Sequence, residues 1–328
     1  MKVNAWDECQ AGVTAERGML RPVHFSVQLP TDRVSQGDEF VSAEAIAEMA
    51  RAAEAAGFDA AFVTDHPAPE DRWLKSGGHQ ALDPFVTLSF VAAATTRLRV
   101  QTHVLVASYR NPFLAAKAIA TLDVLSRGRV IAGIAAGYLE PEFAALGVDY
   151  AERNELSDEA IRSMKQIWAG ESLALEGRHF RAAGHTVLPR PVQQPHPPLW
   201  IGGNSRRAMR RAVELGDGWL PFPAPARMAK RVHTAPMENE SDLEAALAQL
   251  REMAVRAGRS APLDICAAPF ELAYGAKELP PPGTLVETAH RFAGLGVGWL
   301  ILTPPARTRA EFAEGVAKLG GEVIAKLR

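Results

Sequence analysis

Asp65 and His66 form a titratable pair at the end of a β-strand expected over residues 59–66. At the C-terminal end of a strand, such a pair could supply a proton, orient a cofactor ring or polarise a substrate. A non-catalytic interpretation is equally open, in which Asp65 caps a helix and His66 lies in a loop. No second histidine stands two or four residues away, so the spacing does not indicate a zinc site.

Thr102, His103 and Val104 interrupt a strand expected over residues 98–106 that is otherwise rich in β-branched side chains. A polar insertion in such a strand indicates a β-bulge or a residue directed at a ligand. A histidine with a purely structural role is the alternative.

The strand expected over residues 129–137 ends in small residues, which leave backbone rather than bulky side chains at its C-terminal end. These residues are Gly133, Ala135, Ala136 and Gly137. Ligands bind at this end of strands in parallel α/β folds, although tight packing inside a barrel favours the same composition. Glu140 and Glu142 follow, and at least one of them is interpreted as a first-turn acid that the helix dipole favours.

The sequence Gly202, Gly203, Asn204 and Ser205 leads directly into a helix. Free backbone N–H groups and a hydroxyl at a helix N-terminus suit a phosphate, whereas Asn204 or Ser205 as a simple N-cap is the alternative. Four arginines just behind this turn add positive potential for an anion. They are Arg206, Arg207, Arg210 and Arg211. Glu214 follows Arg210 at helical spacing, so an ion-paired solvated surface explains them equally simply.

These candidate residues follow strands that alternate with helices along the whole chain. The expected strands cover residues 24–30, 59–66, 98–106, 129–137, 199–204, 217–223, 263–269 and 298–305. Eight strands, each followed by a helix, predict a TIM barrel, with a doubly wound sheet as the alternative. The rhythm breaks after the fourth helix region, where we expect an insertion with a small hairpin over Glu176 and Gly177. Long loops at 223–240 and 270–283 are expected to border the site and set specificity.

The composition is that of an ordinary globular protein. The chain has 328 residues, a formal net charge of −2 and two cysteines. We expect residues 1–22 to form an N-terminal extension and residues 23–328 one domain. The charge gives no reason to expect a nucleic-acid or membrane partner, and the few cysteines favour the cytoplasm. No nucleophile elbow, phosphate-cradling GK[ST] loop or GxGxxG motif is present.

Three runs of sequence in this order resemble the bacterial luciferase-like monooxygenase superfamily, and within it the F420-dependent oxidoreductases. They cover residues 52–66 (AAEAAGFDAAFVTDH), residues 109–168 from YRNPFL to RSMKQIW, and residues 189–221 from PRPVQQ to GDGWLP. The resemblance is close over residues 24–222. It implies a TIM barrel that binds a flavin or the deazaflavin F420 at its C-terminal mouth, commonly as a homodimer.

The resemblance also assigns cofactor-binding roles to individual residues. Asp65 and His66 match a catalytic pair beside the redox-active ring, with His66 as the residue for acid–base or ring-activating work. Thr102, His103 and Val104 match a strand-three bulge, which implies a non-proline cis peptide at His103-Val104. The remaining matches are Ala136, Gly137 and Tyr138 after strand four, and Gly202, Gly203, Asn204 and Ser205 on the phosphate side. The chain departs from the family pattern at His103, Ala135 and Tyr138.

The leading functional hypothesis is hydride transfer between F420 and a small organic substrate, with His66 handling the proton. The alternative is an FMNH2-dependent monooxygenase that uses molecular oxygen and a separate cofactor reductase, in which the pocket protects a reactive intermediate from water. A non-catalytic cofactor-binding protein is a third hypothesis. A metal-dependent hydrolase is the last, because clustered ligands are missing and no metal is expected.

Overall fold

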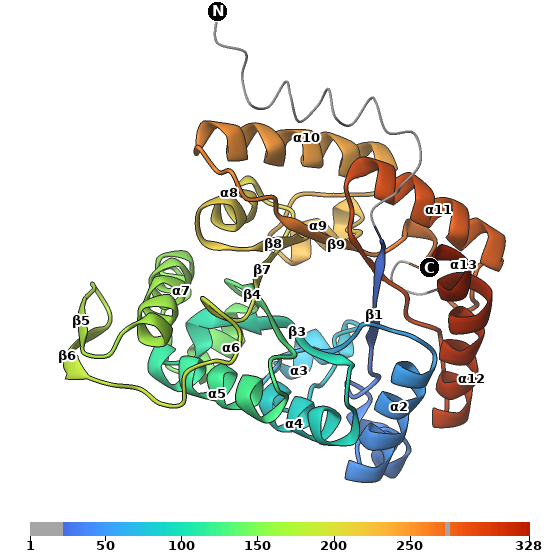
Figure 1. The fold of residues 1–328 in the computed structure, drawn as a ribbon, viewed down its shortest axis with the longest axis horizontal. Helices are drawn as coiled ribbons and strands as arrows, with labels where there is room; N and C mark the ends of the chain where they lie inside the picture. Colours follow the sequence, from blue (N-terminus) through green and yellow to red (C-terminus); the bar gives the residue numbers. More distant parts are fainter. Residues whose placement is uncertain (1–21, 273–275) are drawn as a thin grey trace, which may run out of the picture.

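The computed structural model describes residues 22–272 and 276–328, which form a closed barrel of parallel strands with helices outside it (Figure 1). The strand order around the barrel is β1-β10-β9-β8-β7-β4-β3-β2. These strands are β1 (His24–Gln28), β2 (Ala60–Val63), β3 (Arg99–Val106), β4 (Val130–Ala135), β7 (Leu199–Gly202), β8 (Gly218–Leu220), β9 (Asp264–Ala267) and β10 (Trp299–Ile301). The predicted TIM barrel is confirmed. The doubly wound alternative is wrong, because β1 pairs with both β2 and β10 and closes the sheet.

Helices surround the barrel, and several begin at caps that the sequence encodes locally. The α-helices are α2 (Ala43–Ala55), α3 (Asp71–Lys75), α4 (Pro84–Ala94), α5 (Pro112–Leu125), α6 (Glu140–Ala145), α7 (Arg153–Ala169), α8 (Arg206–Leu215), α9 (Ala226–Arg231), α10 (Glu240–Arg256), α11 (Pro282–Leu295), α12 (Arg309–Leu319) and α13 (Ala325–Leu327). Short 3-10 turns are η1 (Val34–Glu39), η2 (Ala107–Tyr109) and η3 (Phe270–Leu272), and η4 (Gly320–Ile324) is a π-helical turn. Asp83, Asn111 and Ser205 cap α4, α5 and α8 by accepting from backbone N–H groups.

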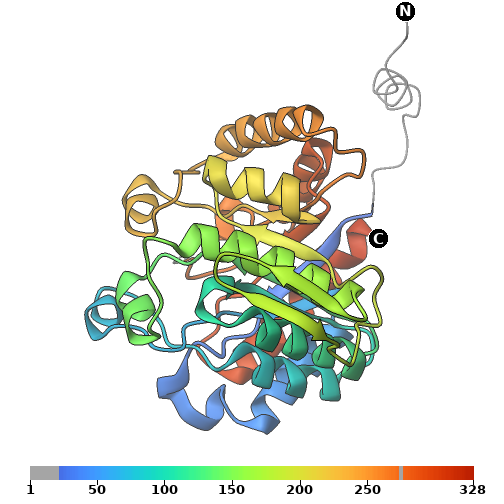
Figure 2. The same ribbon diagram turned by 90° about the vertical axis from the view of Figure 1, so that its left-hand side faces the viewer.

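The insertion after the fourth strand is a hairpin of β5 (Leu173–Glu176) and β6 (Arg181–His185), which pair antiparallel. Figure 2 shows it on the outside of the barrel beside α7. His179 in the turn bonds to Glu159 at 2.5 Å and to Glu152 at 2.9 Å, which ties the hairpin to α7 and its N-cap. The predicted hairpin and its position are confirmed.

The N-terminal segment and the loops at the C-terminal ends of the strands differ from the sequence-based expectation or lie outside the described residues. Residues 1–21 of the expected extension lie outside the described residues, so the division at residue 22 stays a prediction. The loop expected over 223–240 contains α9, and α3 and α6 are further short helices in loops at the C-terminal ends of strands. None of the helices in the described ranges is long and apolar enough to span a membrane.

The barrel has an interior core and a separate, larger core between strands and helices. The interior core is dominated by aromatic and aliphatic side chains of alternate strand positions, including Phe62, Ile131, Trp200 and Trp299. The indoles of Trp200 and Trp299 meet at 5.1 Å between ring centroids, with an interplanar angle of 70°. Side chains therefore fill the lower barrel, and a ligand site is left to the C-terminal end.

The centre of β3 contains the predicted irregularity. The peptide bond between His103 and Val104 is cis, as expected, and the register between β3 and β4 shifts between Thr102 and Leu105. The Thr102 hydroxyl donates to the Gly133 carbonyl at 2.8 Å across the two strands. A Cβ atom on Gly133 would lie 2.1 Å from the Thr102 carbonyl oxygen. The bulge in β3 therefore requires glycine at position 133 on β4.

We expect Gly133→Ala to lower the free energy of unfolding by about 1–3 kcal/mol or more, because the added methyl group collides with backbone rather than with a movable side chain. Denaturant unfolding measures this change. Gly294→Ala is the matched control, since Gly294 is exposed on α11 with no atom near an added Cβ, and alanine there should be neutral or stabilising. Equal effects of the two substitutions would contradict the requirement.

Candidate active site

The C-terminal ends of β2, β3, β4, β7 and β8 border a cavity of about 400 Å³. Ten of the residues proposed from sequence line it: Asp65, His66, His103, Val104, Ala136, Gly137, Tyr138, Gly202, Gly203 and Ser205. Two others, Thr102 and Asn204, are absent from its described lining. The cavity also contacts the start of α7 and the loop that contains α9. One cavity therefore brings together candidates from sequence segments far apart.

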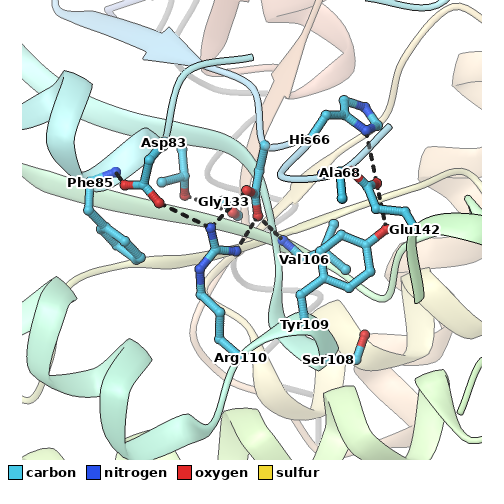
Figure 3. Close-up of polar contacts among 12 residues, drawn as sticks. His66, Ala68, Asp83, Phe85, Val106, Ser108, Tyr109, Arg110, Gly133 and Glu142 are labelled. Atoms are coloured by element: carbon cyan, nitrogen blue, oxygen red, sulfur yellow. Dashed lines mark hydrogen bonds and ion pairs between the residues drawn. The ribbon is translucent and has the colours of Figure 1, made fainter. Parts of the chain in front are cut away.

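His66 is held by a buried carboxylate (Figure 3). Its Nδ1 lies 3.1 Å from Oε2 of Glu142, whose side chain is 0% exposed. Glu142 stands in the first turn of α6 and also accepts from the backbone N–H of Ala68 at 2.9 Å and from the Tyr109 hydroxyl at 2.8 Å. Three donors from the segments after β2 and β3 thus converge on one carboxylate from the segment after β4.

The electrostatics of this cluster fix the histidine tautomer. Burial raises the pKa of Glu142, but the hydrogen bonds from His66, Ala68 and Tyr109 outweigh burial and hold the pKa below its ordinary value. Burial and the neighbouring carboxylate raise the pKa of the Tyr109 hydroxyl, which stays protonated. An ionised carboxylate only accepts, so Nδ1 of His66 carries the hydrogen and Nε2 of the neutral ring is a proton acceptor.

Asp65 has a different environment from His66. Its side chain is 1% exposed and forms a two-point ion pair with Arg110, at 2.6 and 2.9 Å. It also accepts from the backbone N–H of Val106 at 3.1 Å. Arg110 reaches Asp83, the N-cap of α4, at 3.4 Å. Through Arg110, the Asp65 carboxylate therefore connects the ends of β2 and β3 to the N-cap of α4. Figure 3 shows the contact between Arg110 and Asp83.

His103 extends a buried polar chain within the barrel. The Ser26 hydroxyl donates to Oε1 of Gln101 at 3.0 Å, and Nε2 of Gln101 lies 3.2 Å from Nδ1 of His103. The imidazole packs on Phe62, with ring centroids 4.4 Å apart. Burial lowers the pKa of His103 to about 4, so the ring is neutral at pH 7. The neutral His103 imidazole therefore contributes a polar, uncharged group to the cavity wall.

The opposite part of the cavity is cationic. Arg207 and Arg211, one turn apart on α8, line it together with Arg153 at the start of α7. Arg211 pairs with Asp158, and Arg207 bonds to Glu155 at 2.7 Å. Arg206 and Arg210, also proposed from sequence, line a separate surface depression, to which Arg207 also contributes. The helical repeat of α8 thus directs Arg211 to the cavity and Arg206 and Arg210 to the outer surface, with Arg207 between them.

The two proposed residues outside the cavity lining support its walls. Thr102 makes the bond to Gly133 described above. The Asn204 side chain donates to the backbone carbonyls of Phe222 at 2.8 Å and Ala235 at 3.2 Å, and it accepts from the Phe222 N–H at 3.0 Å. Asn204 therefore fastens the end of β7 to the loop after β8.

Sequence reasoning missed four residues of this site. Tyr109, Arg110 and His79 carried no proposed role, and Glu142 was considered only as a helix acid. Leu139, the N-cap residue of α6, and Phe143, next to Glu142, are both apolar and buried, and these apolar neighbours were a local sign of a buried acid. No group of three or more histidine, cysteine or acidic side chains that could bind a metal ion occurs in the described part of the chain.

We expect Glu142→Gln to lower the free energy of unfolding at pH 7 by about 1–3 kcal/mol, because it removes a charged acceptor of three buried hydrogen bonds. The lowered pKa means that the carboxylate stabilises the fold above pH 4.5, its ordinary pKa, and that this contribution is lost as the pH falls through the folded-state pKa. The difference between variant and parent should therefore shrink below pH 4.5.

Urea unfolding at a series of pH values measures this dependence. Glu140→Gln is the control, since Glu140 is exposed in the same turn of α6, and it should change stability by no more than about 0.5 kcal/mol. If the loss in free energy of unfolding caused by Glu142→Gln does not change with pH, the result would argue against an ionised Glu142.

Three curated relatives show how this chain compares with known proteins. An uncharacterized protein of Mycobacterium tuberculosis is 27% identical over 295 residues, which cover 84% of this chain and 93% of that protein. The FMNH2-dependent dimethylsulfone monooxygenase of Pseudomonas putida is 33% identical over 177 residues, 53% of this chain and 47% of that enzyme. The F420-dependent glucose-6-phosphate dehydrogenase of Beutenbergia cavernae is 37% identical over 172 residues, 51% of this chain and 49% of that enzyme. The match thus spans about half the length of these two enzymes.

Solved structures show the same fold over nearly the whole chain. The monooxygenase RslO1 of Streptomyces bottropensis has a TM-score of 0.76 at 20% identity, covering 93% of this chain and 100% of that one. The coenzyme F420-dependent tetrahydromethanopterin reductase of Methanopyrus kandleri has a TM-score of 0.68 at 18% identity, covering 94% and 100%. At these identities the likeness concerns the fold.

The family model described as luciferase-like monooxygenase matches residues 18–277. This match covers well over half of the chain and includes every segment that borders the cavity from β2 to β8. The resemblance seen in the sequence is thereby confirmed. The protein is an enzyme of the luciferase-like monooxygenase family, whose members are oxidoreductases.

Proposed function

We propose that this enzyme transfers a hydride between F420 and a small organic substrate, with His66 exchanging the accompanying proton. The observation that carries the proposal is the Glu142–His66 contact of 3.1 Å at the cavity wall. Adding a hydride to a C=O or C=C double bond also requires adding one proton, and the reverse reaction, which forms the double bond, releases one. An imidazole oriented by a carboxylate can exchange that proton. The 37% identity to an F420-dependent dehydrogenase supports the same cofactor.

The residues of the cavity fit a cofactor with an anionic end. Nε of Arg207 is buried and has no hydrogen-bond partner among the described residues, and this arginine lines the cavity. A Cβ on Gly202 would lie 2.9 Å from Val104, so glycine keeps the space between β7 and β3 open. Ser205, Arg207 and Arg153 would hold the anionic groups. When bound, F420 supplies a two-electron centre that gives or accepts a hydride.

Each residue of the acid–base cluster then has a defined task. Nε2 of His66 accepts a proton from the substrate or returns it. The ionised Glu142 stabilises the imidazolium that forms, and it keeps the ring in one orientation through Nδ1. The ion pair between Asp65 and Arg110 positions the chain segment that carries His66. Trp73 covers this histidine at 4.6 Å between ring centroids and limits water access.

A second candidate, an FMNH2-dependent monooxygenase, is favoured by the 33% identity to the dimethylsulfone enzyme. It would use the same cavity with molecular oxygen and require a separate reductase. The first candidate requires F420 and the second requires FMNH2. A measurement of cofactor binding therefore separates them before a substrate is known.

We expect oxidised and reduced F420 to bind the purified protein at micromolar concentrations, and FMN and FMNH2 to bind at least about tenfold more weakly. Fluorescence titration of each cofactor measures the four dissociation constants. Tighter binding of FMNH2 than of reduced F420, with a flavin hydroperoxide signal after rapid mixing with oxygen, would replace this proposal by the monooxygenase.

Once a substrate is found, His66→Asn should lower kcat by about 10²–10⁴-fold while changing the dissociation constant of F420 by only a few fold, because the proton exchange is lost but the binding groups remain. The control is His290→Asn, since His290 is exposed on α11. Turnover by His66→Asn equal to that of the parent would remove the assigned acid–base role.

A homodimer and a cytoplasmic location remain part of the proposal, as does the expectation of a small-molecule rather than a nucleic-acid or membrane partner. The dimer has support in exposed apolar side chains on α4 and α5. These are Val86 and Phe90 on α4, and Leu114, Val124 and Leu125 on α5. The two helices pack against each other, so these side chains belong to neighbouring elements. Sedimentation equilibrium tests the oligomeric state.

A further inference from the structure

A second histidine lies against His66 at the edge of the cavity. The imidazole rings of His66 and His79 have centroids 4.9 Å apart and an interplanar angle of 85°. Both side chains line the cavity. The indole of Trp73, which is 6% exposed, contacts both rings, at 4.6 and 5.4 Å between centroids. The loop after β2 therefore places two imidazoles on one wall and backs them with a buried aromatic ring.

The hydrogen bonds of the two rings impose the same tautomer on each. Nδ1 of His66 faces the Glu142 carboxylate, and Nδ1 of His79 lies 2.9 Å from the Gln80 carbonyl oxygen. Carboxylate and carbonyl oxygens only accept, so both Nδ1 atoms carry hydrogen in the neutral rings. Each Nε2 is then a lone-pair acceptor. The two neighbouring rings, which both line the cavity, thus carry two acceptors at Nε2.

The surroundings favour one added proton on the pair rather than two. Burial lowers the pKa of His79 below its ordinary value, the bond to Gln80 opposes this shift, and a charge on His66 lowers the pKa further. The titratable and charged groups around the pair are Glu142 on α6, Tyr109 on η2, Asp32 after β1 and Tyr138 after β4. Glu142 contacts His66 directly and offsets one positive charge.

We propose that His66 and His79 jointly accept one proton from a substrate hydroxyl, so that the enzyme oxidises an alcohol and His79 is a second acid–base residue. This inference rests on the proposed function. The carbinol C–H hydrogen leaves with its electron pair to oxidised F420, which is reduced. The O–H bond breaks, its proton goes to Nε2 of the pair, and the C–O bond becomes a carbonyl double bond. The products are a ketone or aldehyde and reduced F420.

The shared proton is tested by NMR titration of the histidine C2–H signals in the cofactor-free protein. We expect the His66 and His79 signals to move together in a first step, because one proton divides between the rings, and a second step to follow at lower pH. In His66→Asn, His79 should titrate in one step at higher pH than that second step. His290→Asn should leave both signals unchanged.

Independent single steps for the two rings, each unchanged when the other is substituted, would overturn the pairing. Thermal unfolding checks that His66→Asn is folded, and His66→Gln provides a second variant if it is not. The same titration of His79→Asn should show His66 in one step with no second step.

The substrate class is tested with cyclohexanol and cyclohexyl methyl ether. The alcohol has a hydroxyl hydrogen that it can donate to the Nε2 acceptors, and the ether has none. We expect the alcohol to shift the two histidine signals with a dissociation constant about fivefold lower than that of the ether, as one extra hydrogen bond allows. His79→Asn should reduce this preference. Equal constants for the two probes, or an unchanged preference in His79→Asn, would overturn the assignment.

These readouts need no cofactor, so the two proposals fail separately. Paired titration and alcohol preference in a protein that does not bind F420 would reject the proposed cofactor and retain the acceptor pair. F420 binding with independent histidines and no alcohol preference would reject the pair and retain the cofactor.

Discussion

The buried carboxylate of Glu142 is the interaction on which the geometry of this site depends. A charge without solvent access is costly unless hydrogen bonds satisfy it. Here the donors are the ring of His66, the backbone of Ala68 and the hydroxyl of Tyr109. They come from the loops after two strands, and the carboxylate comes from the loop after a third. Satisfying one charge therefore fixes three loops relative to one another and orients the imidazole in the process.

The two ends of the cavity differ in the charged groups that line them. At the histidine end, the Glu142 carboxylate contacts His66, so a positive charge on this ring would lie beside a negative one. At the other end, Arg153, Arg207 and Arg211 bring cations to the wall, and their acidic partners are Glu155 and Asp158 for the two on α8. A cofactor with a redox ring and an anionic tail suits this division. The barrel supplies the rigidity, because its strand ends are held by packing and by β-ladder bonds.

The sequence contained most of the fold and part of the site. Alternating strand and helix patterns predicted the barrel because each pattern is local, and the polar insertion at His103 predicted the bulge in β3. The role of Glu142 depends on a contact with a residue 76 positions away, which local periodicity does not report. Asp65 was recognised as titratable, but its partner Arg110 is 45 residues distant, so this ion pair was missed, and with it the contact of Arg110 with Asp83 at the N-cap of α4. Short helices such as α3 lack the length that makes a pattern detectable.

The central claim is that Glu142 holds His66 with hydrogen on Nδ1 and leaves Nε2 as the proton acceptor. Long-range ¹H–¹⁵N NMR of ¹⁵N-histidine-labelled protein at neutral pH distinguishes the two neutral tautomers of this ring directly. The account predicts a protonated Nδ1 and an unprotonated Nε2 for His66, and loss of this preference in Glu142→Gln. A ring protonated on Nε2 alone in the parent protein would contradict it.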